Sequence, residues 1–293
     1  MRKFNVISGM PRAGSTLLCN LLNMNENYHV TPTSAVLDTM KAMRSNFSHD
    51  VTWKAQNRME VYDDFRNGLK GFIEGYFANK EVVFDKSRAW PGNIKLLDEI
   101  LGNTDTKIIW LYRDPVEVIG SIEAQYQKTL LIENTDEQNA PGAFSTLDRR
   151  IGTFMGDGGI VSYPVEILRD SIESGYGDRI LIIKYFDLTN NTQLVLDDIH
   201  DFIGEPRVTY DFKKLKQTTF EYDGFYNYKF LHTIKEGDVK YKKSDVLLPT
   251  KYADVINNKF AGLNKFIFEG NQADFLGISE EELQTQQLTL KLK

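Results

Sequence analysis

The sequence predicts a doubly wound α/β fold, with a mainly parallel β-sheet flanked by helices. Short apolar runs rich in β-branched and aromatic residues alternate with segments of helical periodicity over the first two thirds of the chain. This alternation is typical of parallel sheets, whose strands are buried on both faces. The first run continues through a glycine-bearing loop into an apolar helical segment, which is the strand–loop–helix order of a P-loop.

The elements can be placed in order along the chain. Four apolar runs predict strands at residues 4–8, 81–85, 107–112 and 179–185. Helical patterns lie at residues 15–24, 35–46, 54–79, 92–101, 115–128, 164–174 and 192–203. The glutamates after Ser279 predict the start of a last helix, so we expect a helical C-terminal region. Because the carboxyl ends of parallel strands share one edge of a sheet, the loops that follow them should meet there.

Residues 130–160 interrupt this alternation with a polar, glycine-rich stretch. A long loop of this kind inside a domain is commonly functional. We expect a lid or an acceptor-binding loop, with a variable surface insertion as the alternative. No internal repeat or linker divides the sequence, so residues 1–293 are expected to form a single α/β domain.

Composition narrows the classes of function. The net charge of −6 argues against a general nucleic-acid binder, which is usually basic. No apolar stretch approaches the roughly 20 residues of a membrane span, so no membrane partner is expected. The first strand begins at residue 4, which leaves no room for a signal peptide, and a cytoplasmic protein is expected. The single cysteine, Cys19, allows no disulfide within the chain, and its apolar surroundings predict a buried thiol.

The loop after the first strand predicts an anion site. Gly9 and Gly14 have the spacing of a P-loop, but Ser15 occupies the position of its lysine, and the cation Arg12 lies inside the loop. Backbone N–H groups and the N-terminus of the following helix favour a bound anion. Because ATP-binding P-loops need that lysine on the β- and γ-phosphates, this loop is expected to bind a different phosphate-like group.

A second candidate anion site follows the strand at residues 107–112. Arg113 ends that strand, Pro115 suits the first turn of a helix, and Ser121 lies two turns along it. An arginine and a serine in these positions could bind one phosphate together. The alternative is a structural pair of Arg113 with Asp114 and a solvated Ser121.

Taken together, residues 11–16 and 113–121 resemble the sulfotransferase superfamily, whose donor is 3′-phosphoadenosine 5′-phosphosulfate (PAPS). The first range is similar to the family's 5′-phosphosulfate loop, and the second to its 3′-phosphate motif of an arginine with a serine eight residues later. Residues 179–188 and 199–204 are similar to a later strand and helix end of the family. The resemblance implies a single domain that transfers a sulfuryl group from PAPS to a hydroxyl or amine, releases 3′,5′-adenosine bisphosphate, and needs no metal.

The resemblance also implies roles for individual residues. Lys86, which follows the strand at residues 81–85, would act with Arg12 on the charge that develops on the leaving phosphate. No metal ligand is implied. The residues that would bind the donor are Arg12, Ala13, Gly14, Ser15, Thr16, Arg113, Ser121 and Tyr185.

The group that takes the acceptor's proton is left open. Some family members place a histidine two residues after the lysine, but here Arg88 stands there, and an arginine is always protonated. Arg88 would instead suit an anionic acceptor. The nearby candidates for the base are His29, Asp38 and Asp85.

Two C-terminal features carry open alternatives. Residues 240–243 contain three lysines that could close over the 3′-phosphate or form a solvated face. The aromatic residues between 220 and 230 could line an acceptor pocket or pack in a core: Phe220, Tyr222, Phe225, Tyr226, Tyr228 and Phe230.

Two other functions stay open at this point. In a P-loop kinase or nucleotide hydrolase, Asp85 would bind magnesium with Ser15 and Thr16, although the missing lysine argues against that function. A non-catalytic nucleotide-binding relative would fit the lack of an evident base. The motifs specify neither the acceptor nor the oligomeric state.

Overall fold

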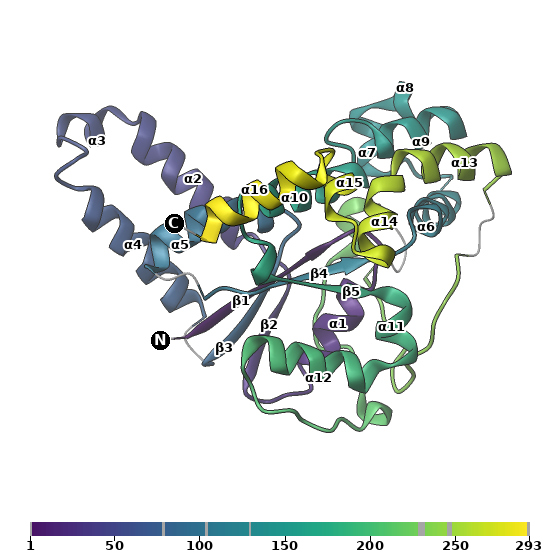
Figure 1. Cartoon of the computed structure of the whole chain (residues 1–293), viewed down its shortest axis with the longest axis horizontal. Helices are drawn as coiled ribbons and strands as arrows, with labels where there is room; N and C mark the ends of the chain where they lie inside the picture. The colour runs from purple at the N-terminus through teal and green to yellow at the C-terminus, as the bar shows by residue number, and fades with distance from the viewer. Residues whose placement is uncertain are drawn as a thin grey trace.

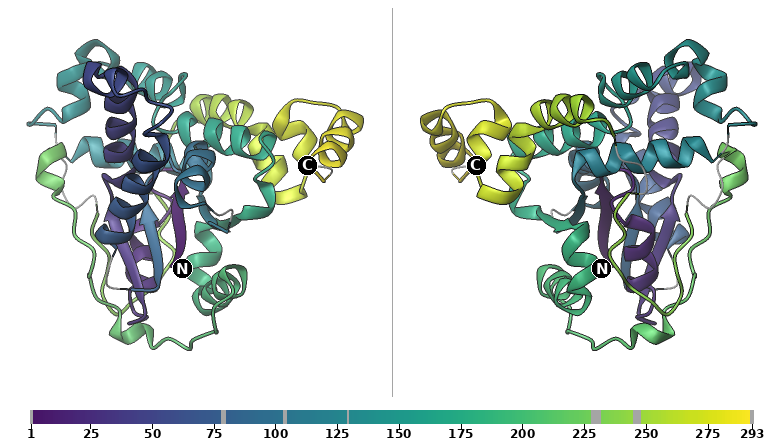
Figure 2. Two further views of the ribbon diagram at one scale, coloured as in Figure 1. Left: turned by 90° about the vertical axis from the view of Figure 1, so that its left-hand side faces the viewer. Right: turned by 90° about the vertical axis from the view of Figure 1, so that its right-hand side faces the viewer.

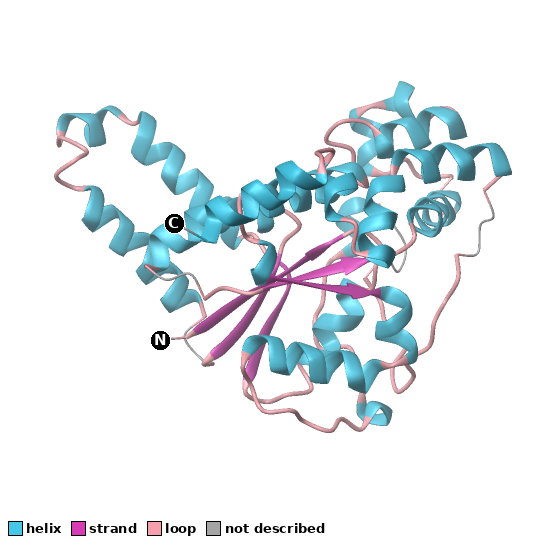
Figure 3. Ribbon diagram, in the orientation of Figure 1, coloured by secondary structure: helices cyan, strands magenta, loops and turns pink. Residues whose placement is uncertain are grey.

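Five parallel strands form one sheet in the order β2-β3-β1-β4-β5 (Figure 1). This computed structural model describes residues 2–77, 80–102, 105–128, 130–227, 232–244 and 248–291. The strands are β1 (Lys3–Gly9), β2 (Tyr28–Thr33), β3 (Val82–Lys86), β4 (Ile108–Tyr112) and β5 (Ile180–Lys184). Helices lie on both faces of the sheet, so the predicted doubly wound α/β fold is confirmed (Figure 3).

Strand β2 was not predicted, whereas the other four strands lie within two residues of their predicted bounds. Its sequence from Tyr28 to Thr33 contains His29, two threonines and Pro32 in place of an apolar run. An edge strand tolerates such residues because one of its backbone edges needs no partner. The pairing of β2 with β3 accordingly shifts in register between Val30 and Thr33.

Two layers of helices enclose the sheet. The helices α1 (Ser15–Leu22) and α12 (Thr192–Ile203) cover one face, where Tyr28 packs edge-on against His200 of α12. The other face is covered by α4 (Tyr62–Tyr76), α5 (Ile94–Leu101) and α10 (Ser162–Glu173). There the ring of Phe4 lies 5.4 Å from Phe77 and 5.7 Å from Trp90. Burial of the strands between these layers removes their apolar side chains from water.

Cys19 lies on the buried side of α1, as the apolar sequence around it predicts. Burial raises the pKa of its thiol to about 11. A thiol of this kind carries little thiolate at neutral pH, so it contributes packing and no chemistry.

The helical arm at the left of Figure 1 corrects one prediction. In place of a single helix over residues 54–79, the chain forms α3 (Val51–Ala55) and then turns into α4. Asn57 takes a left-handed conformation, with φ of 54°, which ends the first segment. Residues 78 and 79 lie outside the described residues. The third helix of the arm is α2 (Val36–His49). Its Phe47 stacks on Phe65 of α4, with the ring centres 4.1 Å apart.

Residues 130–160 are largely helical, so the expectation of an irregular loop is wrong. They contain α7 (Thr135–Asn139), α8 (Pro141–Phe144) and α9 (Leu147–Met155). Asn134 and Glu137 form a capping box that starts α7. Arg150 of α9 forms a buried ion pair of 2.7 Å with Glu123 of α6 (Pro115–Gln127), which fixes the segment to the domain. A role as a lid stays a prediction.

The C-terminal region is helical, as expected. It comprises α13 (Thr250–Lys259), α14 (Ala261–Glu269), α15 (Gln272–Leu276) and α16 (Glu280–Lys291). Ser279 and Glu282 exchange hydrogen bonds at the start of α16 in the predicted capping box. Figure 2 shows the last of these helices, in yellow, projecting from one side of the molecule.

Between α12 and α13 the chain is mostly irregular. We name its residues 216–227 and 232–244 the strap; it contains one short turn of 3₁₀ helix, Asp223–Tyr226. Beside β5, the short helix α11 (Tyr185–Asn190) begins directly at the strand's end. No helix of the described ranges is both long enough and apolar enough to cross a membrane.

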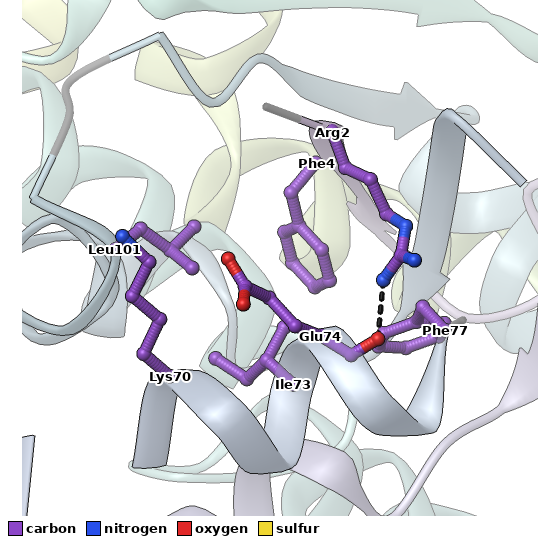
Figure 4. Close-up of a pocket in the computed structure, with 7 residues that line it drawn as sticks. All are labelled: Arg2, Phe4, Lys70, Ile73, Glu74, Phe77 and Leu101. Atoms are coloured by element: carbon purple, nitrogen blue, oxygen red, sulfur yellow. Dashed lines mark hydrogen bonds between the residues drawn. The ribbon is translucent and has the colours of Figure 1, made fainter. Parts of the chain in front are cut away.

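A small cavity lies beside the start of β1, at the end of the sheet away from the strap and α11 (Figure 4). Arg2, Phe4 and Phe77 contribute to its wall, and Arg2 donates a hydrogen bond to the carbonyl of Glu74. Its volume of about 20 Å³ holds roughly one water molecule, so it is not a ligand site.

Candidate functional site

The loop between β1 and α1 makes a tight turn at the carboxyl edge of the sheet. A side chain at Gly9 would place its Cβ 2.4 Å from the backbone of Leu111 in β4, so only glycine fits. Gly14 has a φ of 90°, and a Cβ there would lie 2.8 Å from the ring of Tyr185. Arg12, between them, is also left-handed, with φ of 58°. The loop therefore lies directly against both β4 and the start of α11.

Helix α1 begins at Ser15, immediately after Gly14. Gly14 has no side chain with which to cap the helix, so the first N–H groups of α1 are available to an anion at the loop. The loop residues Arg12, Ala13, Gly14, Ser15 and Thr16 thus form the strand–loop–helix turn that the sequence predicts.

Arg113 directly follows β4 and reaches over this loop. Its guanidinium donates to the carbonyl of Arg12 at 2.9 Å and to that of Lys242 in the strap at 2.8 Å. Its Nε donates to Glu117 at 3.0 Å, and the ring of Tyr185 lies 4.5 Å from the guanidinium carbon. The alternative pairing with Asp114 is wrong, because Asp114 caps α6 by accepting from the N–H groups of its first turn.

The two predicted anion motifs touch through Arg12 and Ser121. Nε of Arg12 donates to Oγ of Ser121 at 3.2 Å, across 109 residues of sequence. Burial and the neighbouring Arg113 lower the pKa of Arg12, although arginine stays charged. Two guanidinium groups thus lie close together in a partly buried place, which attracts an anion.

Lys86 lies at the end of β3 and is nearly buried, with 10% of its side chain exposed. Its Nζ forms an ion pair of 2.5 Å with Oε1 of Glu221, a strap residue that the sequence analysis missed. Burial works to raise the pKa of Glu221, but the charge and hydrogen bond of Lys86, together with His232 and Thr33, lower it. The N–H of Thr33 also donates to Oε1 of Glu221, at 3.2 Å.

His232 and Asp223 extend this contact within the strap. Nε2 of His232 lies 3.2 Å from Oε2 of Glu221, and Nδ1 lies 2.6 Å from Oδ1 of Asp223. Burial lowers the pKa of His232, against the opposing charges of Glu221 and Asp223. These residues follow no local motif, and only the folded strap brings them to Lys86.

The three predicted candidates for the base lie elsewhere. Asp85 is fully buried and uses both oxygens, accepting from Thr31 at 2.9 Å and from the Trp90 indole at 2.7 Å. Burial raises its pKa. His29 pairs with Val83, three residues before the end of β3.

The side chains of His29 and Asp38 have other surroundings. The ring of His29 packs edge-on against Phe77 at 5.4 Å, and Asp38 is exposed in the first turn of α2. Within the described part of the chain, neither these two nor Asp85 forms an ion pair with Lys86.

The lysine-rich segment contacts the site through its backbone. The carbonyl of Lys242 accepts from Arg113, and Lys240 pairs with Asp238 at 3.3 Å. Beside them, the Tyr241 ring lies 5.6 Å from that of Tyr185, and its hydroxyl donates to Glu117. Contact of residues 240–243 with a 3′-phosphate stays a prediction.

The aromatic residues of the strap do not form a core. Phe220, Tyr222 and Phe225 are 74%, 81% and 69% exposed, so the core alternative is wrong for them. Tyr226 is half-buried, whereas Tyr228 and Phe230 lie outside the described residues. Arg88 is exposed at the same edge of the sheet, and its carbonyl accepts a hydrogen bond from Ser8.

Comparison with known protein families and solved structures identifies one family. A family model described as a sulfotransferase domain matches residues 5–237. The sulfotransferase domain from the curacin biosynthetic pathway is 16% identical, with a TM-score of 0.56 over 89% of this chain and 98% of that chain. This structural similarity shows that the two chains share a fold.

Two further structures match less closely. The sulfotransferase domain from the Synechococcus PCC 7002 olefin synthase is 20% identical, with a TM-score of 0.49 over 89% of this chain and 94% of that chain. A mouse sulfotransferase complexed with PAP is 14% identical, with a TM-score of 0.48 over 88% and 84%. No curated protein sequence matches the chain.

Proposed function

Because this chain belongs to the sulfotransferase family, we propose that it takes a sulfuryl group from PAPS and transfers it to an acceptor hydroxyl or amine. The observation that carries the proposal is the junction of the two anion motifs. Arg12 donates to Ser121, and Arg113 donates to the carbonyl of Arg12, so one cluster joins both motifs. A nucleotide with phosphate groups at two positions needs such a double cationic site.

The residues present fit this donor. The loop of residues 11–16 offers backbone N–H groups, the N-terminus of α1 and the side chain of Arg12 to the 5′ group. Arg113 and Ser121 would bind the 3′-phosphate, and the face of Tyr185 lies beside them. Arg113 now binds the carbonyls of Arg12 and Lys242, and a phosphate would replace such neutral acceptors with a stronger charged one.

PAPS, when bound, supplies the sulfuryl group and 3′,5′-adenosine bisphosphate as the leaving group. Lys86 and Arg12 would stabilise negative charge at the leaving phosphate. Arg113 and Ser121 would orient the nucleotide, and correct positioning supplies a large part of such catalysis. The polar contacts of these residues, rather than new covalent bonds, carry the proposed role of the protein.

The P-loop kinase alternative is disfavoured by Asp85. A magnesium ligand needs a free carboxylate oxygen, but both oxygens of Asp85 bind neighbouring side chains inside the protein. Ser15 and Thr16 then lack the partner that such a metal site requires.

Thermal denaturation with added nucleotides tests the proposal. We expect 3′,5′-adenosine bisphosphate to raise the melting temperature more than AMP or ATP with magnesium. Of the three nucleotides, it alone carries a phosphate at both the 3′ and the 5′ position. At a concentration of about 100 times Kd, the stabilisation should reach about 2.7 kcal/mol. The Arg113→Ala variant should lose this effect, whereas Lys128→Ala, at the exposed end of α6, should keep it.

Transfer is tested next with radiolabelled PAPS and a panel of phenols, sugars, aliphatic alcohols and amines. Labelled product from one class would identify the acceptor. A preference for ATP with magnesium in the first experiment would overturn the proposal. Nucleotide binding without transfer to any acceptor would favour the non-catalytic relative.

A further inference from the structure

A continuous line of polar contacts leads from Lys86 into the strap. It runs from Lys86 Nζ to Glu221 at 2.5 Å, from Glu221 to His232 Nε2 at 3.2 Å, and from His232 Nδ1 to Asp223 at 2.6 Å. Only 9–17% of each of these side chains is exposed. Burying four ionisable groups together is costly for stability, and such groups are concentrated at functional sites.

Asp223 holds the imidazole of His232 in one orientation. One carboxylate oxygen contacts Nδ1 at 2.6 Å, and the other accepts the backbone N–H of His232 at 3.1 Å. A carboxylate on Nδ1 selects the tautomer that carries its proton there, which leaves Nε2 with a lone pair. The lone pair therefore points to the side of the ring where Glu221 and Lys86 lie.

The charges around His232 depend on where Lys86 binds. Among the described residues, the groups that face the ring are Glu221, Asp223 and the half-buried Tyr226 from the strap, and Lys86 from β3. Burial and Lys86 lower the pKa of His232, whereas Glu221 and Asp223 raise it. Removing Lys86 from Glu221 would thus make the imidazole more basic.

We propose that His232 takes the acceptor's proton at Nε2, and that Lys86 leaves Glu221 for the donor's leaving phosphate when the donor binds. The inference rests on the function proposed above. Glu221 is then a resting partner for Lys86, and Asp223 is a positioning residue for His232. One exchange of partner by Lys86 would prepare both the leaving group and the base.

The transfer step balances with these residues. The acceptor oxygen forms a bond to sulfur while the bond from sulfur to the 5′-phosphate oxygen breaks. The electron pair of the broken bond stays on that phosphate, where Lys86 and Arg12 would stabilise it. The hydroxyl proton goes to Nε2 of His232 and later to water. The imidazolium formed then faces Glu221, whose carboxylate Lys86 no longer neutralises.

Titration of the histidines by NMR tests the exchange without an acceptor. The chain has four histidines, and His232→Gln identifies the signal of His232. We expect saturation with 3′,5′-adenosine bisphosphate to raise the pKa of His232 by about one unit, as an unneutralised carboxylate nearby would. His49, exposed at the end of α2, should not respond and serves as the internal control.

The Lys86→Met variant shows whether the rise in the pKa of His232 comes from the movement of Lys86 or from the charge of the bound nucleotide. Without Lys86, the pKa of His232 should be higher before the nucleotide is added, and most of the later rise should be absent. The same rise in wild type and Lys86→Met would overturn the exchange. No rise in wild type, despite nucleotide binding, would overturn it as well.

Variant kinetics test the base with the acceptor that the panel identifies. His232→Gln should lower kcat by about 100-fold or more and leave the Kd of the bisphosphate within about twofold. Glu221→Gln should tighten bisphosphate binding several-fold, because Lys86 is released. The matched control His49→Gln should keep wild-type kcat. Wild-type kcat in His232→Gln would overturn the assignment.

The outcomes separate this inference from the function on which it rests. If the protein fails to bind 3′,5′-adenosine bisphosphate, both are overturned. If it binds the nucleotide and transfers sulfuryl groups while His232→Gln stays fully active, only the assignment of the base is overturned. Loss of nucleotide binding in His232→Gln, in step with the loss of kcat, would indicate a structural role and also overturn that assignment.

Discussion

Asn20 of α1 anchors Thr219 of the strap through both ends of its side-chain amide. Its Nδ2 donates to Oγ1 of Thr219 at 2.9 Å, and its Oδ1 accepts from the N–H groups of Thr218 and Thr219. The Asn20 side chain is completely buried. The helix that begins at the anion loop therefore also fixes the segment that carries Glu221, Asp223 and His232.

Replacing Asn20 should loosen the strap. Asn20→Leu keeps a similar volume but leaves the backbone N–H groups of Thr218 and the buried Thr219 without their acceptor, at a cost of about 2 kcal/mol. Urea denaturation measures this loss as a lower midpoint. Asn139→Ala, at the exposed end of α7, is the control and should change the free energy of unfolding by less than about 0.5 kcal/mol. Equal midpoints for Asn20→Leu and wild type would contradict the anchoring role.

Gly14→Ala should damage the anion loop directly. The added Cβ meets the Tyr185 ring at 2.8 Å, and the φ of 90° disfavours any side chain. We expect a loss of about 1–3 kcal/mol in the free energy of unfolding and a weaker response to 3′,5′-adenosine bisphosphate in thermal denaturation. Gly68→Ala, in α4 with open space around it, should instead be neutral or stabilising. The same effect from both substitutions would argue against the tight turn.

The buried pair of Arg150 and Glu123 should be needed for the fold of residues 130–160. The side chains are 10% and 3% exposed, and the guanidinium also lies 4.2 Å from the Tyr126 ring. Arg150→Met leaves a buried carboxylate unpaired, so we expect a loss of about 3–5 kcal/mol in urea denaturation. Arg149→Met, one residue earlier and exposed, should cost less than about 0.5 kcal/mol. A small loss in both variants would show that the pair is dispensable.

Glu221 should make stability depend on pH in the acid range. Burial works to raise the pKa of Glu221, but Lys86, His232 and Thr33 together lower it in the folded protein. A carboxyl with a lowered pKa stabilises the fold above its unfolded value, about 4.3, and this contribution is lost as the pH falls through the folded pKa. The difference in free energy of unfolding between wild type and Glu221→Gln should thus be full near about pH 7 and shrink below about pH 4. If the difference in free energy of unfolding grew on acidification, the pKa of Glu221 would be raised in the folded protein, which would contradict this prediction.

Local pattern was sufficient for much of the fold. The predicted helix at residues 192–203 agrees with α12, because its apolar periodicity and the stop at Gly204 are both local signals. Strand β2 gave no such signal, since an edge strand with Pro32 lacks the continuous apolar run. The predicted helix at residues 54–79 failed at Asn57, where a left-handed residue turns the chain although the surrounding pattern stays helical.

The same distinction between local and non-local signals separates the site residues that were predicted from those that were missed. Arg12, Arg113 and Ser121 were predicted because each lies in a short motif next to a strand end, and the structure brings them into contact. Glu221 and His232 were missed because the strap has no periodicity, and 135 residues of sequence separate Glu221 from its partner Lys86. The contacts of Asn20 with Thr218 and Thr219, together with those of Glu221 with Lys86 and Thr33, hold these groups at the edge of the sheet.

Pro32 has a consequence for how the molecule behaves in concentrated solution. It lies in the outermost strand on one side of the sheet, where unpaired backbone groups could recruit a strand from another molecule. Proline has no N–H to donate, the register shift near it makes the border irregular, and the N–H of Thr33 already donates to Glu221 of the strap. This border is therefore a poor template for intermolecular strand addition, which protects the protein from aggregation through that side.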